Sequence, residues 1–215
     1  MEKPIKGFLI TLEGGEGSGK STILHRLADS LQEDGLSVVV THEPGGSEVG
    51  KQIRQWVLEK VHKTPLDPMA ELMLFLADRA QHIHEVIRPA LEDGKIVLCD
   101  RFNDSTVAYQ GFGRGLDVPR VQEICDLVSG YVKPFLTILL DVDPYKGLER
   151  AKKESGTMDR IESEQLAFHE QLHRGFHWLH EQNPERISLI DANQPVEHVF
   201  ERTRDLINSR LSEYV

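Results

Sequence analysis

Short runs of apolar residues alternate along the chain with longer segments in which apolar residues recur every three or four positions. The short runs are rich in Val, Ile and Leu without a polar alternate, which is typical of parallel strands buried on both faces. We therefore predict five strands, in GFLITLE (7–13), SVVVT (37–41), KIVLCD (95–100), FLTILLD (135–141) and RISLID (186–191).

The segments between the predicted strands have the apolar spacing of amphipathic helices. Alternating strands and helices indicate an α/β domain, in which helices cover both faces of a parallel sheet. No repeat, low-complexity tract or Pro-, Gly- or Ser-rich linker divides the 215 residues, so we expect one domain. The predicted helices cover residues 20–34, 47–60, 67–93, 117–130, 143–153, 161–182 and 195–212.

The composition, at 39% hydrophobic and 28% charged residues, is that of a globular protein with a full core. Acidic residues outnumber Lys and Arg by 35 to 25, which gives a formal net charge of −10. Binding to a nucleic-acid polymer requires a basic face, so we expect no such partner. A small anion in a locally basic pocket is compatible with this charge.

The cysteines and the lengths of the apolar runs indicate a cellular location. Cys99 and Cys125 form neither a CxxC motif nor a metal-ligand spacing, so we expect reduced thiols. The apolar run near the N-terminus is too short for a secretory signal, and no run approaches the ~18 apolar residues of a membrane span. We therefore expect a cytoplasmic protein with no membrane partner.

A glycine-rich stretch, GGEGSGKS, follows the first predicted strand and precedes the first predicted helix. It fits the phosphate-loop pattern G-x-x-x-x-G-K-[ST]. Backbone N–H groups of such a loop, and the N-terminus of the next helix, attract phosphate. Lys20 is expected to reach the β- and γ-phosphates and the Ser21 hydroxyl to bind Mg²⁺. The predicted nucleoside triphosphate site comprises Gly14, Gly15, Glu16, Gly17, Ser18, Gly19, Lys20, Ser21 and Thr22.

Acidic residues end four of the predicted strands, at Glu13, Asp100, Asp141 and Asp191. In open α/β sheets, ligands bind beyond the carboxyl ends of the strands. Asp100 precedes Arg101, and a carboxylate beside a guanidinium suits a site that holds both Mg²⁺ and phosphates. We therefore prefer Asp100 to Asp141 as the metal ligand.

The stretch DRFNDSTVAYQG (100–111) contains an unusual number of hydrogen-bonding side chains. If residues 103–110 are helical, Ser105 and Tyr109 share a face, and Gln110 lies on the adjacent face. The position after a buried strand places this stretch at the ligand-binding edge.

A second group of residues, in LFLADRAQ, suits a planar base. Phe75 and Arg79 are four residues apart on a predicted helix, so an aromatic ring and a guanidinium share a face. A guanine-specific switch would carry D-x-x-G and N-K-x-D elements at strand ends, and neither occurs there. These features favour a small-molecule kinase over a switch or a motor.

Together the motifs closely resemble the bacterial thymidylate kinase family. The resemblance covers essentially the whole chain, and its E-P-G-G and D-R-x-x-x-S-T-x-A-Y-Q-G segments are far more specific than the phosphate loop. It implies a P-loop NTPase three-layer fold with a mobile lid. It also implies Mg²⁺-dependent transfer of the γ-phosphoryl group of ATP to dTMP, giving dTDP for dTTP biosynthesis. The matching stretches are LEGGEGSGKST, THEPGGSEVGKQIR, LMLFLADRAQH, VLCDRFNDSTVAYQG and MDRIE.

Matched by position, the resemblance implies a role for each residue of the acceptor site. Phe75 stacks on thymine, and Arg79 lies beside the base and the phosphate. Tyr109 crowds the 2′ carbon and thereby disfavours ribonucleotides. Arg54 and Gln110 address the base edge. The residues implied around the monophosphate and deoxyribose are Glu43, Arg101, Ser105 and Tyr109.

The segment LERAKKESGTMDRIE (148–162) resembles the mobile lid of the family. Members without an arginine in the phosphate loop supply a basic group from the lid, and this loop carries Glu16 instead. Lys152 and Lys153 are candidates for that group, but the two lid arginines are preferred. The implied catalytic residues are Lys20, Arg101, Arg150 and Arg160.

The chain departs from the family pattern before E-P-G-G, where His42 replaces the common arginine. His42 either weakens a monophosphate contact, makes that contact depend on pH, or is a neutral histidine without a ligand role. The family is typically homodimeric, which implies a contact through the apolar face of residues 67–93. Two alternatives stay open: another nucleoside or nucleoside monophosphate kinase of this fold, and a non-catalytic nucleotide-binding switch.

Overall fold

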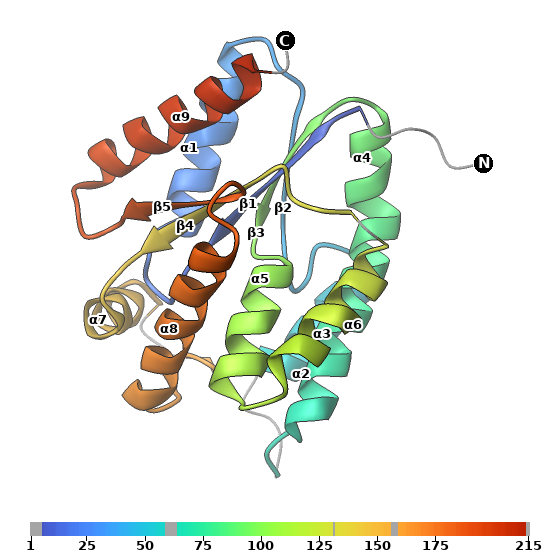
Figure 1. The fold of residues 1–215 in the computed structure, drawn as a ribbon, viewed down its shortest axis with the longest axis vertical. Helices are drawn as coiled ribbons and strands as arrows, with labels where there is room; N and C mark the ends of the chain where they lie inside the picture. Colours follow the sequence, from blue (N-terminus) through green and yellow to red (C-terminus); the bar gives the residue numbers. More distant parts are fainter. Residues whose placement is uncertain (1–5, 59–63, 131, 156–158, 214–215) are drawn as a thin grey trace.

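The computed structural model describes residues 6–58, 64–130, 132–155 and 159–213. Its five strands are all parallel and form one sheet in the order β2-β3-β1-β4-β5 (Figure 1). Each strand overlaps one of the predicted apolar runs, so the predicted α/β fold with a five-stranded parallel sheet is confirmed. The strands are β1 (Phe8–Glu13), β2 (Val38–His42), β3 (Ile96–Asp100), β4 (Leu136–Asp141) and β5 (Ile187–Asp191).

Helices cover both faces of the sheet and give the fold three layers (Figure 1). One face is covered by α1 (Lys20–Glu33) and α9 (Val196–Ser212). Two π-helices, η1 (Ile83–Ile87) and η2 (Val107–Gly113), continue α-helices that precede them. The remaining helices are α2 (Glu48–Leu58), α3 (Pro68–His82), α4 (Arg88–Glu92), α5 (Asn103–Thr106), α6 (Val118–Ser129), α7 (Pro144–Ser155) and α8 (Leu166–Gln182).

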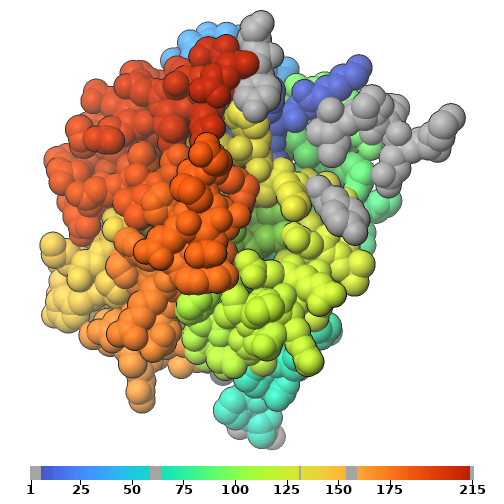
Figure 2. Space-filling view, viewed as in Figure 1, coloured from blue at the N-terminus to red at the C-terminus, as the bar shows by residue number. Residues whose placement is uncertain are grey.

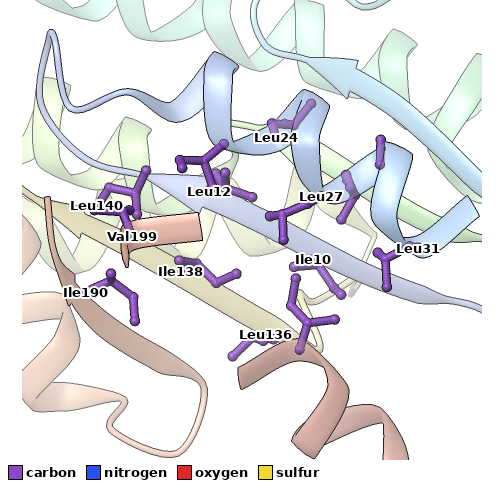
Figure 3. Packing of buried hydrophobic residues seen from close by; sticks show 14 of the residues in the cluster. Ile10, Leu12, Leu24, Leu27, Leu31, Leu136, Ile138, Leu140, Ile190 and Val199 are labelled. Carbon is purple, nitrogen blue, oxygen red and sulfur yellow. The ribbon is translucent and has the colours of Figure 1, made fainter. Parts of the chain in front are cut away.

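Alternate residues of β1 face the two helical layers. Ile10 and Leu12 pack with Leu24 and Leu27 of α1, and all four are at most 2% exposed (Figure 3). Leu9 points to the opposite layer, in the cluster formed with η1 and α4. Burying each such side chain stabilises the fold by about 1.5–3 kcal/mol. In the space-filling view, the helices in front, α8 among them, hide most of the sheet (Figure 2).

The strand register brings the polar strand ends to one edge. Leu12 and His42 both pair with Asp100 across the ladders, and Asp141 pairs with Asp191. Because all five strands run in the same direction, their carboxyl ends meet at the edge where the loop after β1 begins. This edge is where ligands bind in open α/β sheets.

Candidate functional site

A cavity of about 830 Å³ lies at the carboxyl edge of the sheet. Small-molecule sites typically measure about 300–1,000 Å³, so this cavity is near the upper end of that range. The phosphate loop lines one part of it, and residues of α2, α3 and η2 line another. All the predicted acceptor residues line it, namely Glu43, Arg54, Phe75, Arg79, Arg101, Ser105, Tyr109 and Gln110.

The phosphate loop folds tightly around its own lysine. Nζ of Lys20 donates to the carbonyl oxygens of Gly14 at 3.1 Å and Gly15 at 2.8 Å. Gly14, Gly17 and Gly19 have positive φ angles, which glycine adopts without steric cost. Burial lowers the pKa of Lys20. The helix α1 begins at Lys20, so its positive N-terminal end opens toward the loop.

Ser21 and Asp100 meet at the start of α1. The Ser21 hydroxyl donates to Oδ2 of Asp100 at 3.0 Å. Oδ1 of Asp100 is buried and has no hydrogen-bond partner among the described residues. A hydroxyl oxygen and a carboxylate with a buried free oxygen form a donor set that Mg²⁺ accepts. Asp141, the rival candidate, is paired with histidines of α8 instead.

Arg101 joins the phosphate loop to the stretch that follows β3. Its Nη1 donates to the carbonyl oxygen of Gly14 and to Oγ of Ser105, both at 3.1 Å. Its Nη2 lies 2.9 Å from Oε1 of Glu16, and its guanidinium lies 4.9 Å from the ring centre of Tyr109. The structure therefore brings Arg101, Ser105 and Tyr109 together.

Glu16 accepts hydrogen bonds from both sides of this junction. The Tyr109 hydroxyl donates to Oε1 of Glu16 at 2.5 Å, on the same oxygen that contacts Arg101. Burial opposes ionisation of Glu16, but the positive charges of Arg101 and Lys20 outweigh it and lower the pKa to about 2. A charged Glu16 thus fixes the position of the Tyr109 ring over the cavity.

Glu13 supports the site, although the sequence identified it only as an acidic residue at the end of a strand and predicted no role for it. It is fully buried and accepts from the backbone N–H of Phe102 at 2.7 Å and from the Ser105 hydroxyl at 2.5 Å. Burial and the nearby charge of Asp104 raise the pKa of Glu13 to about 8. Glu13 therefore holds the turn that carries Arg101 while remaining largely uncharged at neutral pH.

The far part of the cavity is lined by the residues expected to bind a base. Phe75 is half-buried there. Nη1 of Arg54 donates to the carbonyl oxygen of Pro44 at 2.8 Å. Nε2 of Gln110 donates to Oε1 of Glu71 at 3.0 Å, so the amide of Gln110 has a fixed orientation. These side chains form an aromatic and polar pocket opposite the phosphate loop.

A buried ion-pair network supports this pocket. Nε of Arg79 donates to Oε2 of Glu43 at 2.7 Å, and Nη1 donates to the Thr106 hydroxyl at 2.9 Å. His82, which the sequence did not single out, contacts Oε1 of Glu43 at 2.9 Å. Burial raises the pKa of nearby Asp78 to about 6. The guanidinium of Arg79 is thus held in place by its neighbours at the cavity wall.

The predicted lid arginines contact other parts of the chain. Nη1 of Arg150 donates to the carbonyl oxygen of Ala192 at 2.9 Å. Nη2 of Arg160 donates to Oε2 of Glu71 at 2.5 Å. Neither arginine lines the described part of the cavity, whereas their lid neighbours Asp159 and Ile161 do. Residues 156–158 of the predicted lid lie outside the described residues.

Glu71 is a second residue that the sequence did not reveal. It is 1% exposed, and it binds Gln110 and Arg160, as well as Arg114 at 3.0 Å. Its place in the first turn of α3 gave no signal, because its partners come from η2, from the residue after η2 and from the lid segment. Glu71 therefore ties the base pocket to the lid.

His42, the departure from the family pattern, lines the cavity beside Arg54. Burial lowers its pKa, and the positive charge of Arg54 lowers it further. His42 is therefore neutral at physiological pH. A neutral imidazole binds an anion more weakly than an arginine would at this position.

The sheet order, the phosphate loop after β1 and the Ser21–Asp100 pair define a P-loop nucleotide-binding protein. The chain belongs to the thymidylate kinase family: a family model described as thymidylate kinase matches residues 12–203.

Comparisons with individual proteins agree with this assignment. The chain is 48% identical to a thymidylate kinase of Protochlamydia amoebophila over 97% of this chain and 95% of the relative. It is 49% identical to one of Desulfovibrio desulfuricans over 95% of this chain and 96% of the relative. A crystal structure of thymidylate kinase from Ehrlichia chaffeensis superposes with a TM-score of 0.74 at 33% identity, covering 94% of this chain and 98% of that one.

Within the described ranges, no helix is both long and apolar enough to cross a membrane.

Proposed function

We propose that the protein transfers the γ-phosphoryl group of ATP to the 5′-phosphate of dTMP and so produces dTDP. Membership of the thymidylate kinase family supports this reaction. The observation that carries it is one cavity that reaches from the phosphate loop to Phe75 and Gln110. A nucleotide switch has no use for a second, base-sized pocket beside its phosphates.

The reaction requires alignment and positive charge more than covalent chemistry. The second pKa of a phosphate monoester is about 6, so dTMP is already a nucleophile at neutral pH and no general base is needed. Lys20 binds the donor phosphates in the phosphate loop. Arg101, which contacts both this loop and Ser105, stands between donor and acceptor. Both cations stabilise the charge of the transferred group.

We assign Mg²⁺ to Ser21 and Asp100, whose oxygens lie 3.0 Å apart. When bound, Mg²⁺ neutralises charge on the β- and γ-phosphate oxygens. The buried and unpaired Oδ1 of Asp100 supports this assignment, because such an acceptor requires a cation or a donor to satisfy it.

We assign the acceptor nucleotide to the pocket opposite the loop. Phe75 stacks on the base, and Arg54 and Gln110 address its edge. The Tyr109 ring, fixed by Glu16, excludes a 2′-hydroxyl by its bulk. Arg79 and Glu43 form a buried pair that shapes the wall beside the acceptor phosphate.

In this proposal, a lid arginine, Arg150 or Arg160, supplies further positive charge beside the transferred phosphoryl group. Each has another partner in the structure, Ala192 for Arg150 and Glu71 for Arg160. The role therefore requires the lid to shift toward the phosphate loop when both substrates are bound, as closing loops do in many phosphotransferases.

The proposal extends to location and assembly. Two buried free cysteines, Cys99 and Cys125, support a reducing compartment, the cytoplasm. Exposed methionines on α3, Met69 and Met73, support a homodimer that uses this helix.

A coupled assay with dTMP, dUMP, CMP and AMP as acceptors tests the substrate. We expect strong preference for dTMP, and equal use of AMP or CMP would contradict the proposal. Lys20→Ala should reduce transfer at least about 10²–10³-fold, because a donor to the transferred phosphate is lost. Lys51→Ala, which removes an exposed lysine paired with Glu48, is the control and should keep full activity.

A further inference from the structure

Three possible metal ligands converge at the end of β4. Oδ1 of Asp141 lies 2.9 Å from Nε2 of His173 and 3.0 Å from Nε2 of His177. The two imidazole rings have centroids 4.4 Å apart. One carboxylate oxygen therefore faces two imidazole nitrogens, and all three atoms lie within 4.8 Å of one another.

This arrangement needs little adjustment to hold a metal ion. Ligand atoms bound at about 2.0–2.1 Å to a tetrahedral Zn²⁺ lie roughly 3.3 Å apart, only slightly more than the observed Asp–His separations. His173 and His177 are four residues apart on α8, so both rings project from one face of the helix. We propose that Asp141, His173 and His177 form a site for Zn²⁺ or a similar transition-metal dication.

The donor atoms distinguish this site from the proposed Mg²⁺ position. Imidazole nitrogen suits zinc, nickel, copper and cobalt, whereas Mg²⁺ prefers an octahedron of oxygen ligands. Ser21 and Asp100 offer oxygen atoms alone. Asp141 and the two histidines do not contribute to the described lining of the large cavity. The protein thus carries two sites with different metal preferences.

The site is accessible from solvent. The side chains of His173 and His177 are each 36% exposed, and that of Asp141 is 23% exposed. An ion can enter without unfolding, and water can occupy the fourth position of a tetrahedral ion.

The position of the site gives a bound ion a mechanical consequence. Asp141 ends β4, and the two histidines lie on α8. A shared ion closes a loop between residues 141 and 173, which are 32 positions apart. Closing this loop holds α8 against the end of β4.

Titration calorimetry of the untagged, nucleotide-free protein with ZnCl₂ tests the site. We expect one Zn²⁺ per chain, unaffected by millimolar Mg²⁺. His173→Gln, His177→Gln and Asp141→Asn should each weaken binding at least about tenfold, given that loss of even an outer-shell partner costs about 10–100-fold. His198→Gln removes an exposed histidine of α9 and should bind Zn²⁺ like the wild type.

Thermal melts followed by circular dichroism show whether each variant is folded, so that a loss of zinc binding is not mistaken for a loss of structure. Zn²⁺ should raise the Tm of the wild type and of His198→Gln, but not that of a folded His173→Gln variant. Cobalt provides a second probe, since Co²⁺ on two imidazoles and a carboxylate gives the visible absorption of a tetrahedral site. The proposal is overturned if the wild type binds no zinc, or if the three ligand variants bind it as tightly as the wild type.

Discussion

Arg101 has a left-handed backbone, with a φ of 70°. This conformation costs a non-glycine residue about 1–2 kcal/mol. It is held by a hydrogen bond from the Arg101 N–H to the carbonyl oxygen of Leu12 at 3.0 Å and by the side-chain contacts to Gly14 and Ser105. The turn directs the guanidinium back toward the phosphate loop, where the transferred phosphate must pass in the proposed reaction.

Phe75 allows a direct test of the acceptor pocket. Stacking of a base on an aromatic ring contributes about 1–3 kcal/mol. Phe75→Ala should therefore raise the KM for dTMP roughly 5–100-fold and leave the KM for ATP nearly unchanged. Steady-state kinetics with each substrate varied in turn would measure both. Phe75→Tyr retains a stacking ring and should stay close to the wild type, whereas a defect confined to ATP would mean that the pocket is placed wrongly.

Glu13 should make stability depend on pH. Its pKa is about 8 in the folded protein against 4.5 ordinarily, so the folded state binds more protons between these values. Stability should therefore fall as pH rises from 4.5 to 8, by up to about 1.4 kcal/mol per pH unit from this group. Glu13→Gln removes the titration and should flatten the decline.

Urea unfolding at pH 6, 7 and 8 would measure the effect of Glu13. The matched control is Glu149→Gln, which changes an exposed glutamate of α7 and should leave the pH profile as it is. If the stability of Glu13→Gln falls with pH as steeply as that of the wild type, Glu13 is not the titrating group and the expectation fails.

The site residues that sequence reasoning missed share a physical cause. Glu71, Asp78 and His82 are all buried polar residues whose partners come from distant parts of the chain. Residues such as Lys20 and Ser21 are recognisable because their spacing alone fixes the chemistry. A buried carboxylate in a helix or at a strand end acquires its role only from packing.

At the scale of elements, the apolar runs predicted the strands well. The run 95–100 contains β3, and 7–13 contains β1, since a strand covered on both faces is built mostly from apolar residues. The helix predicted for 161–182 begins at Leu166 instead. Residues 159–162 form a turn in which the backbone N–H groups of Asp159 and Glu162 each donate to the other's carboxylate. These local bonds compete with the helix.

The stretch after β3 differs from the predicted helix in its winding. It starts as α5 and continues as the π-helix η2, where the N–H of Arg114 donates to the carbonyl of Tyr109. Sequence periodicity does not distinguish an α-helix from a π-helix over so few residues. The wider winding leaves Tyr109 and Gln110 both facing the cavity.

The phosphate loop and α7 touch backbone to backbone, which makes Gly147 sensitive to substitution. A Cβ atom at residue 147 would lie 2.3 Å from the carbonyl oxygen of Glu16. Gly147→Ala must therefore displace the loop or the helix. We expect a stability loss of about 1–3 kcal/mol and a higher KM for ATP.

Denaturant unfolding and ATP kinetics measure the two effects of Gly147→Ala. Glu149→Ala, an exposed substitution two positions along the same helix, serves as control and should change neither. An unchanged KM for ATP in Gly147→Ala would show that the loop does not depend on this contact.

At the scale of the whole molecule, one sheet edge organises both proposed sites. Asp100 and Glu13 at the ends of β3 and β1 serve the large cavity, and Asp141 at the end of β4 faces α8. The sequence predicts all three residues at this edge, because parallel strands end on the same side of a sheet. The second site could not be predicted in the same way, because the histidines of α8 that contact Asp141 lie more than 30 residues further along the chain.

The outer surface of α2 and α3 supports the proposed homodimer. Met69 and Met73 lie four residues apart on α3 and are 46% and 44% exposed, and Trp56 on the adjacent α2 is 54% exposed. Side chains of this kind are buried in the cores of stable interfaces.

Sedimentation equilibrium should therefore give about twice the chain mass of 24.4 kDa for the wild type. Met73→Glu should shift it toward the monomer, because a charge in the interface core is left unpaired. Val196→Glu, at an exposed apolar position on α9, should remain dimeric. A wild-type monomer, or a dimer that persists in Met73→Glu, would contradict an interface on α3.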